Sequence, residues 1–464
     1  MNSDDGGSFW DQEAASTVDP DLGVDDFPDN PLMGILYGFQ HTLVDPNPFI
    51  YPFIIGAAAG WSETTIGNMM QVTLIFVMIA TVTQVTIGNR LPLLQNVSLS
   101  EVGIMASIAS TVNAPAMWMA AFVGGLFESI VGFSGVLKYL KFAITPAVSG
   151  SVIIVIGISL AEVGMGWIFH GEDLSSINRR LAFAVATLTI FLLFKIIGDL
   201  YAKILSRSSL LLTLLVVGLA IPWISDTLEL THALNFQPVF NAPWFGLPRP
   251  TYSGLPVVGW PLVFGSIIAM TVGYVSSIME SVGDYAAACS VSDAKFTEET
   301  IHRGISLEGS VSALSVLFGG LPMTSYSQNI GIIATTKIAS RKVVMIAGLF
   351  FGLFGLLPKV GRLITLIPQA VLGSVFLIIT GMITVSGIWT VAQATRTEAN
   401  MLIIALTVTI SLTLPNAVES TAWLGSLPSN LNVILTNSIV LAVITGITCS
   451  FFFDFLLGGQ INEK

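Results

Sequence analysis

The sequence predicts an all-α polytopic membrane protein with about fourteen spans, arranged as two inverted repeats of seven. Three observations support this: composition, recurring apolar runs and a weak internal duplication. Hydrophobic residues make up 53% of the 464 positions and charged residues only 10%, whereas about a quarter of a soluble domain is charged. Apolar runs recur along the chain at 68–87, 114–134, 181–198, 209–224, 261–280, 343–357, 371–390, 400–414 and 434–458. Less regular segments supply the remaining crossings, at roughly 20 residues each.

The second half of the chain weakly repeats the first. The pattern Ala-Val-x-Gly-Ser-Val stands at 147–152 and again at 370–375. Leu91-Pro92 recurs as Leu321-Pro322, and a short polar stretch follows each pair. An odd number of spans in each half makes the two copies face opposite sides of the membrane. Interrupted segments at matching positions of two such halves indicate the binding site of a transporter.

The charges predict the topology. The first 31 residues contain nine acidic residues and no Lys or Arg, which predicts a disordered tail and not a signal peptide. With the N-terminus in the cytoplasm, twelve of the Lys and Arg residues fall inside and five outside. This agrees with the positive-inside rule and puts both termini of a plasma-membrane protein in the cytoplasm. Four acids near span ends are expected at the interface: Glu128, Glu162, Asp199 and Asp454.

A polar string at 324–341 interrupts the apolar sequence, and within it stand Gln328, Asn329 and Gly331. Amides facing lipid are costly, so these side chains are expected to line a cavity. An amide offers a donor and an acceptor together, which suits the edge of a base or an imide. Gly331 would allow close approach of backbone. A polar clamp between helices is the alternative, and Lys337, Arg341 and Lys342 are expected to be cytoplasmic anchors.

Carboxylates and a histidine are the other candidates. Glu280 and Asp284 are four residues apart and share a helical face, where mutual repulsion would make at least one hold a proton. They predict a solute or coupling-cation site, unless they reach water at a helix end. Glu308 could couple a cation or simply begin a helix. His41, beside Gln40, could relay protons or be a satisfied core residue.

Several function classes lack their signatures. The sequence contains no Walker loop, nucleotide fingerprint or hydrolase elbow, which argues against an ATP-driven pump. We find no nucleophile–base pair and no metal-ligand cluster, so an enzyme is not expected. Cys289 and Cys449 stand in apolar surroundings and predict neither a disulfide nor a metal site. We therefore expect no cofactor, no metal and no nucleic-acid partner.

The motifs together resemble those of the nucleobase–ascorbate transporters, or nucleobase–cation symporters, over residues 32–458. The resemblance is carried by Gln328-Asn329-x-Gly331-x4-Thr336-Lys337-x2-Ser340-Arg341, Gln40-His41, Gly88-x-Arg90-Leu91-Pro92, Pro146-Ala-Val-Ser-Gly-Ser151, Glu280-Ser-Val-Gly-Asp-Tyr285 and Arg303-Gly-Ile-x-x-Glu308-Gly309. It implies a homodimer of fourteen-span subunits in which a core domain moves against a gate domain. It also implies short strands in spans three and ten, with the solute between them, held by Glu280, Gln328 and Asn329.

The resemblance implies the following division: acidic tail 1–31, core spans one to four 32–140, gate spans five to seven 141–225, extracellular loop 226–260, core spans eight to eleven 261–360, gate spans twelve to fourteen 361–458 and C-terminal tail 459–464. In span three the chain departs from the family. Where many members have Gly-x-Ser-Phe-x-Phe, this chain has Asn96-Val-Ser-Leu-Ser-Glu101. The solute contacts of that span therefore fall to Ser98 and Leu99, without aromatic stacking.

The function predicted from these features is secondary active import of a xanthine- or urate-like oxopurine, coupled to H⁺ or Na⁺. Gln328 complements paired donors and acceptors on such a base. His41, Gln40, Asp284, Glu308 and Gly331 are the candidates for coupling a cation or supporting the site. Uracil or ascorbate symport remains an alternative, and a passive anion channel or an embedded receptor is a different class that related folds can serve.

Overall fold

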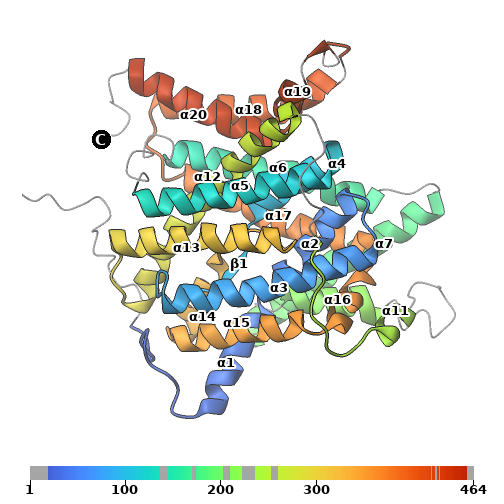
Figure 1. The fold of residues 1–464 in the computed structure, drawn as a ribbon, viewed down its shortest axis with the longest axis vertical. Helices are drawn as coiled ribbons and strands as arrows, with labels where there is room; N and C mark the ends of the chain where they lie inside the picture. The colour runs from blue at the N-terminus through green and yellow to red at the C-terminus, as the bar shows by residue number, and fades with distance from the viewer. Residues whose placement is uncertain are drawn as a thin grey trace, which may run out of the picture.

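The computed structural model describes residues 19–135, 145–169, 174–201, 209–221, 236–251, 260–419, 421–423, 426–427 and 429–456. Figure 1 shows long helices around one short two-stranded sheet. The first half contains α1 (Pro31–Leu43), α2 (Asn47–Ala58), α3 (Glu63–Thr86), β1 (Gln95–Val97), α4 (Leu99–Thr111), α5 (Ala114–Ser134), α6 (Pro146–Phe169), α7 (Leu174–Tyr201), α9 (Ser209–Leu215) and η3 (Val216–Ala220). The second contains α11 (Gln237–Asn241), α12 (Trp260–Ser292), α13 (Glu298–Leu317), β2 (Met323–Ser325), α14 (Ser327–Thr336), α15 (Arg341–Gly355), α16 (Pro358–Thr365), α17 (Gln369–Val391), α18 (Glu398–Glu419), α19 (Ser429–Thr436) and α20 (Ser438–Leu456).

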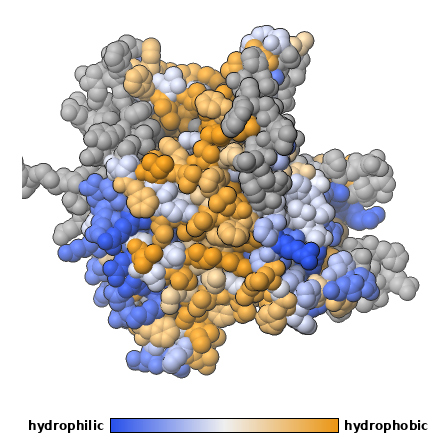
Figure 2. All heavy atoms as spheres, in the orientation of Figure 1, coloured by the Kyte–Doolittle hydropathy of each residue, from blue (hydrophilic) through white to orange (hydrophobic). Residues whose placement is uncertain are grey.

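The described helices form a membrane belt. Seven are long and apolar enough to cross a bilayer, and an eighth crossing results if α15 and α16, bent by 79°, count as one span. The other predicted crossings do not pass as single apolar helices. Some are broken, as at α1–α2, β1–α4, β2–α14 and α19–α20, and α13 carries several charged residues. Figure 2 shows a hydrophobic band from top to bottom of the visible face, with hydrophilic side chains on either side of it.

Helix contacts of the first half recur in the second, in agreement with the predicted fold class of two seven-span repeats. Helix α15 packs on α3, and their counterparts α5 and α13 pack on each other in the same way. Helix α1 packs on α15 as α12 packs on α5. The repeated Ala-Val-x-Gly-Ser-Val segments lie in α6 and α17, which pack together closely. In α6, Gly150 approaches the backbone of Val391, where a Cβ atom would lie 2.6 Å from its nitrogen.

The two strands, one from each half of the chain, pair with each other. β1 pairs antiparallel with β2, with Asn96 opposite Thr324. Each strand is held by a hydroxyl of the matching helix, because the Gln95 amide donates to Thr81 Oγ1 at 3.1 Å and the Met323 amide donates to Ser312 Oγ at 2.9 Å. Backbone polar groups that an unwound span exposes at membrane depth are satisfied in this way. The predicted strands in spans three and ten are therefore present.

Packing divides the helices into two groups. The core group pairs α1–α5 with α12–α15, and the gate group joins α6, α7 and α9 to α17, α18 and α20. The division into core and gate domains stays a prediction, and its boundary at 360 falls inside α16. The predicted loop 226–260 contains α11, which packs on α16; there Lys359 Nζ donates to the Val239 carbonyl at 2.8 Å. The predicted C-terminal tail, 459–464, lies outside the described residues.

The acidic N-terminal segment differs from the predicted disordered tail over residues 19–30. Leu22 forms a parallel bridge with Ile338, and the amides of Ala339 and Arg341 donate to the carbonyls of Leu22 and Val24. Arg341 binds the Asp25 carboxylate and donates to the Val85 carbonyl at 2.7 Å. Arg341, expected to be a membrane anchor, is therefore a clamp between α3, α15 and this segment. Residues 1–18 of the predicted tail lie outside the described residues.

Candidate functional site

Two half-helices begin beside the sheet, in the middle of broken spans. Asn329, in the first turn of α14, is fully buried and its Nδ2 donates to the Pro92 carbonyl at 2.9 Å. Ser98, the N-cap residue of α4, is fully buried too, and its amide donates to the Pro322 carbonyl at 3.3 Å. Each half-helix is thus tied to the Leu-Pro segment that precedes the opposite strand. Leu99 begins α4, but its side chain lies outside the described residues.

One face of α12 is joined to β2 and α14 by hydroxyl groups. Ser277 Oγ donates to Thr324 Oγ1 at 3.0 Å, and Ser281 Oγ lies 3.0 Å from the same oxygen. Asp284 Oδ2 accepts from Ser325 Oγ at 2.7 Å and from Ser327 Oγ at 3.0 Å. Because these positions of α12 are separated by four and three residues, they share one side of the helix. Asp284 is therefore buried and satisfied by the tenth span, and it does not end a helix in water.

The neighbouring faces of α12 and α14 are accessible. Exposed positions follow one helical side of each: Glu280, Gly283 and Ala287 on α12, and Gln328, Gly331 and Thr335 on α14. The two helices pack together, so Glu280 and Gln328 lie on the accessible faces of neighbouring elements. Glu280 keeps exposed surface, and the cavity-facing role of this pair stays a prediction.

A narrow crevice lies between the core and the gate, where α12 faces α6 and α20. It is lined by Val148, Ser149, Val152, Val275, Ser276, Met279, Val443 and Ile447. Its lining is mostly apolar, and it is too small to hold a solute of drug size.

Gly331 lies on the open side of α14. A Cβ atom built there would have no neighbour within 4 Å, beyond its own helix. The residue is exposed on the accessible side of α14, so packing does not require a glycine at this position. Its position fits the lining of the opening, and the close backbone approaches of the core occur elsewhere, at Gly125, Gly132 and Gly309.

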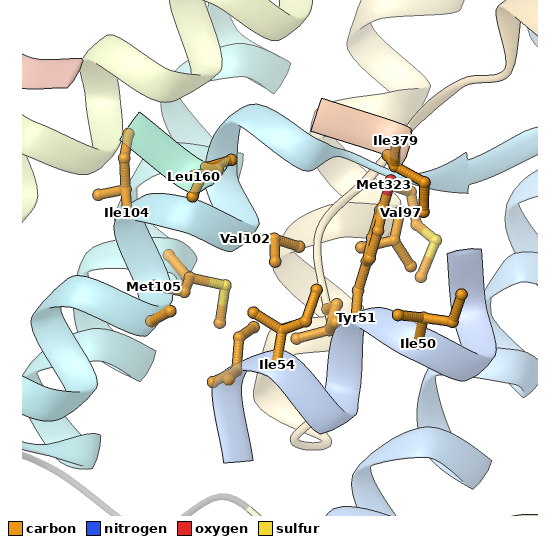
Figure 3. Packing of buried hydrophobic residues seen from close by; sticks show 14 of the residues in the cluster. Ile50, Tyr51, Ile54, Val97, Val102, Ile104, Met105, Leu160, Met323 and Ile379 are labelled. Carbon is orange, nitrogen blue, oxygen red and sulfur yellow. The ribbon is translucent and has the colours of Figure 1, made fainter. Parts of the chain in front are cut away.

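A polar break in the first span adds residues that sequence reasoning missed. Asp45, fully buried between α1 and α2, accepts from the Asn47 amide at 3.2 Å and faces the side chain of Asn96. Tyr326, just before α14, donates through its hydroxyl to the Val44 carbonyl at 3.0 Å. Tyr51 of α2 lies beside Met323 of β2 (Figure 3). The run Asp45-Pro-Asn-Pro48, which interrupts an apolar span, is the sequence feature that could have predicted this break.

Three glutamates are buried in the core group. Glu101 and Glu128 have no exposed surface and Glu308 is 1% exposed. Glu128 was predicted at a membrane interface, but its side chain has no exposed surface and α5 packs on both α12 and α13. Glu162 and Asp199 are exposed, their interfacial position stays a prediction, and the side chain of Asp454 lies outside the described residues. Glu308 lies by Ser281, Tyr285 and Gln95, so it does not simply cap a helix that begins at Glu298.

The candidate pair in the first span, Gln40 and His41, belongs to a helix with a different main packing partner from those of α12 and α14. His41 is buried and Gln40 half-buried in α1, which packs mainly on α15 and not on α12. The helix arrangement therefore gives no support to a direct link between His41 and Glu280. Among the described residues, no group of three His, Cys, Asp or Glu side chains is arranged to hold a metal ion.

Comparison with known proteins identifies the family. The sequence profile of the Permease family, for xanthine and uracil permeases, matches residues 33–420. The nucleobase transporter PlUacP of Paenibacillus larvae is 31% identical over 90% of this chain and 93% of that protein. The uric acid permease PucK of Bacillus subtilis is 30% identical over 92% of this chain and 96% of that protein.

Solved structures share the fold. The transmembrane domain of the cyanobacterial bicarbonate transporter BicA superposes with a TM-score of 0.57 at 16% identity, covering 92% of this chain and 99% of that one. Murine Solute Carrier 26 family member A9, an anion transporter in its inward-facing state, gives 0.67 at 10% identity over 93% of this chain and 69% of that one. The family profile spans most of the sequence, and the motifs at Gln328, Glu280 and Glu308 lie within it. The chain therefore belongs to the xanthine–uracil permease family, the nucleobase–ascorbate transporters.

Proposed function

We propose that this permease is a secondary active importer of an oxopurine nucleobase of the xanthine or urate type, coupled to H⁺ or Na⁺ by alternating access. The observation that carries the proposal is the accessibility of Glu280 and Gln328 on two packed core helices inside an apolar belt. Relatives similar along almost the whole chain are a nucleobase transporter and a uric acid permease.

Each site residue has a chemical role in the proposal. The Glu280 carboxylate accepts hydrogen bonds from ring N–H groups, and the Gln328 amide pairs with the donor–acceptor edge of the solute. Asn329 braces the half-helix through its bond to Pro92, and Ser98 holds the opposite half-helix. Asp284 and Glu308, together with His41 and Gln40, are the candidates for coupling the cation, and Gly331 lines the path.

The direction of the opening supports an inward-facing arrangement. The accessible positions on α14 run from Gln328 to Thr335, toward Lys337 and the docked N-terminal segment. The proposal puts that side in the cytoplasm with both termini, in the plasma membrane. The core group would then carry the solute past the gate group by an elevator-type movement, within a homodimer embedded in lipid.

Uptake into proteoliposomes tests the function. Labelled xanthine should accumulate against its gradient and the accumulation should disappear when the proton and sodium gradients are collapsed. Glu280→Gln should abolish concentrative uptake while the protein inserts normally, and Glu162→Gln, which alters an exposed residue of α6, should transport like the wild type. Full transport by Glu280→Gln would refute its assignment.

The alternatives separate in the same assay. Unlabelled urate, uracil and ascorbate should compete to different extents, and failure of every oxopurine to compete would reject the proposed solute class. The anion transporters that share the fold are 16% identical or less, so they supply architecture only. Gradient-insensitive flux without accumulation would favour a passive channel.

A further inference from the structure

Three glutamates from different core helices lie together, apart from the accessible face. Glu101 is in the first turn of α4, Glu128 is in α5 and Glu308 is in α13. Gly309, the residue after Glu308, packs against the backbone of Glu128 and Ser129. Glu101 is near enough to Glu128, Glu308 and Glu280 for their charges to repel one another.

Close backbone packing fixes where these side chains lie. In α5, Gly125 contacts the backbone of Ala313, and in α13, Gly309 contacts the backbone of Ser129 and Gly125. Ser129 Oγ and Ser310 Oγ are 2.7 Å apart across the same contact. On the other side, a Cβ atom on Gly273 of α12 would lie 3.6 Å from Glu101 Cγ. The cluster is therefore part of the rigid interior of the core group.

Uncharged polar groups point to a ligand at this place. The Gln95 amide and the Tyr285 hydroxyl are fully buried and face Glu308. Within the described part of the chain, the carboxylate oxygens of all three glutamates are buried without a close, well-aligned hydrogen bond, although Ser281, Tyr285 and Gln95 lie within reach of Glu308. Buried polar groups are nearly always satisfied, so three such carboxyl groups together indicate a place that takes up a small polar ligand.

The surrounding charges favour a proton. The titratable groups that face the cluster are acidic or phenolic: Glu280, Asp284, Tyr274 and Tyr285 of α12. Basic groups of α13, His302 and Arg303, pair instead with Glu298 and Glu299 near its beginning. A buried carboxylate without a cationic partner is costly, and taking a proton from hydronium forms one O–H bond and removes the charge. Returning that proton to water on the other side breaks the bond and completes the cycle.

We propose that Glu101, Glu128 and Glu308 form an internal proton-binding site that exchanges protons with the solute site through Glu280. The inference rests on the proposed function and deepens it, because it assigns the coupling ion and adds Glu101 and Glu128 to the coupling machinery. Glu101 is the third residue of α4. Asn329 is the third residue of α14, the matching half-helix in the second half of the chain. The proton site thus begins at the position that matches the amide of the tenth span.

Glu101→Gln and Glu128→Gln test the proposal, because glutamine keeps the shape of a protonated glutamate but cannot release a proton. In proteoliposomes, a gradient of one pH unit should let the wild type accumulate solute about tenfold if one proton is carried. Each variant should reach no accumulation, yet keep solute binding by thermal shift and keep exchange of internal for external solute. Glu162→Gln is the matched control and should accumulate like the wild type.

The outcomes distinguish this inference from the proposed function. If the wild type accumulates no oxopurine, the proposed function fails. If the wild type accumulates and both variants do so equally, the cluster is structural and the inference is overturned. Accumulation driven by sodium alone, or loss of binding and exchange together with accumulation in a variant that melts normally, also overturns it. Solute-triggered proton uptake by the purified protein, followed with a pH-sensitive dye, should be present in the wild type and absent in Glu128→Gln, because a solute and a proton that are carried together favour each other's binding.

Discussion

The Asn329 side chain donates a 2.9 Å hydrogen bond to the backbone carbonyl of Pro92. This bond joins the half-helix of the tenth span to the segment before the strand of the third. Two broken spans from opposite halves of the chain are therefore held together where backbone groups have left their regular helical pattern. Gln328, the preceding residue, is exposed, so one amide braces the break while its neighbour faces the opening.

Replacing these two amides should have different effects. Asn329→Ala leaves a buried carbonyl without its donor and should lower the free energy of unfolding by about 1–3 kcal/mol. Gln328→Ala removes an exposed side chain and should weaken oxopurine binding with little change in stability. Thermal melting and ligand titration of the purified variants measure both. Equal loss of stability in the two variants would contradict the division of roles.

The contribution of Asp284 to stability should depend on its hydrogen bonds to the tenth span. Its Oδ2 accepts from two hydroxyls, and hydrogen bonds to a charged group contribute about 1.5–3 kcal/mol. Ser325→Ala, which removes a buried donor, should therefore destabilise more than Ser327→Ala, whose donor is exposed. A double-mutant cycle with Asp284→Asn should give a coupling energy for Ser325. Additive effects of Ser325→Ala and Asp284→Asn would show that the bond contributes nothing.

Two glycines of the core should tolerate alanine differently. In Gly309→Ala, the new methyl group would lie 2.6 Å from the Gly125 carbonyl oxygen, and overpacking of this kind costs about 1–3 kcal/mol. Gly331→Ala meets nothing within 4 Å and should keep or raise the melting temperature, since alanine is the better helix former. Comparing the two melting temperatures checks the prediction. A large loss at Gly331 would mean that its surroundings are closed.

The stabilisation that Arg341 provides should depend more on the geometry of its hydrogen bonds than on its charge. Asp25 is 74% exposed at its side chain, so its pair with Arg341 is worth at most about 1 kcal/mol and should weaken with salt. The bond from Arg341 to the Val85 carbonyl is shielded and has no such screening. Arg341→Lys should therefore destabilise more than Asp25→Asn at high salt, because lysine lacks the planar fork. Equal melting temperatures for both variants at high salt would argue against this account.

The opening should be reachable from the cytoplasmic side. Ala287→Cys and Thr335→Cys replace exposed residues of α12 and α14, in a chain whose Cys289 and Cys449 are changed to serine. Membrane-impermeant maleimide should label both positions in inside-out vesicles more than in right-side-out ones, and oxopurine should slow the reaction. Cysteine placed at buried Ala288 is the control and should stay unlabelled. Preferential labelling from outside would reverse the proposed orientation.

The sequence by itself determined the membrane class, the broken tenth span and the candidate amides. Apolar runs of spanning length and a polar string between them reflect the local cost of exposing polar groups to hydrocarbon. The helical period also put Glu280 and Asp284 on one face of a helix. These features depend on residues close together in the chain, so they can be derived without knowledge of the fold.

Only the tertiary structure decided which element covers each side chain. Glu128 was predicted at an interface, but the contacts of Gly125 and Gly309 bury it against another helix. Asp284 is satisfied by Ser325, 41 residues away, and residues 19–30 dock on a loop more than three hundred positions later, where Ser340 bonds Asp26 across 314 residues. Hydropathy and periodicity cannot predict such pairs, because these contacts form only after helices that are distant in the sequence have packed together.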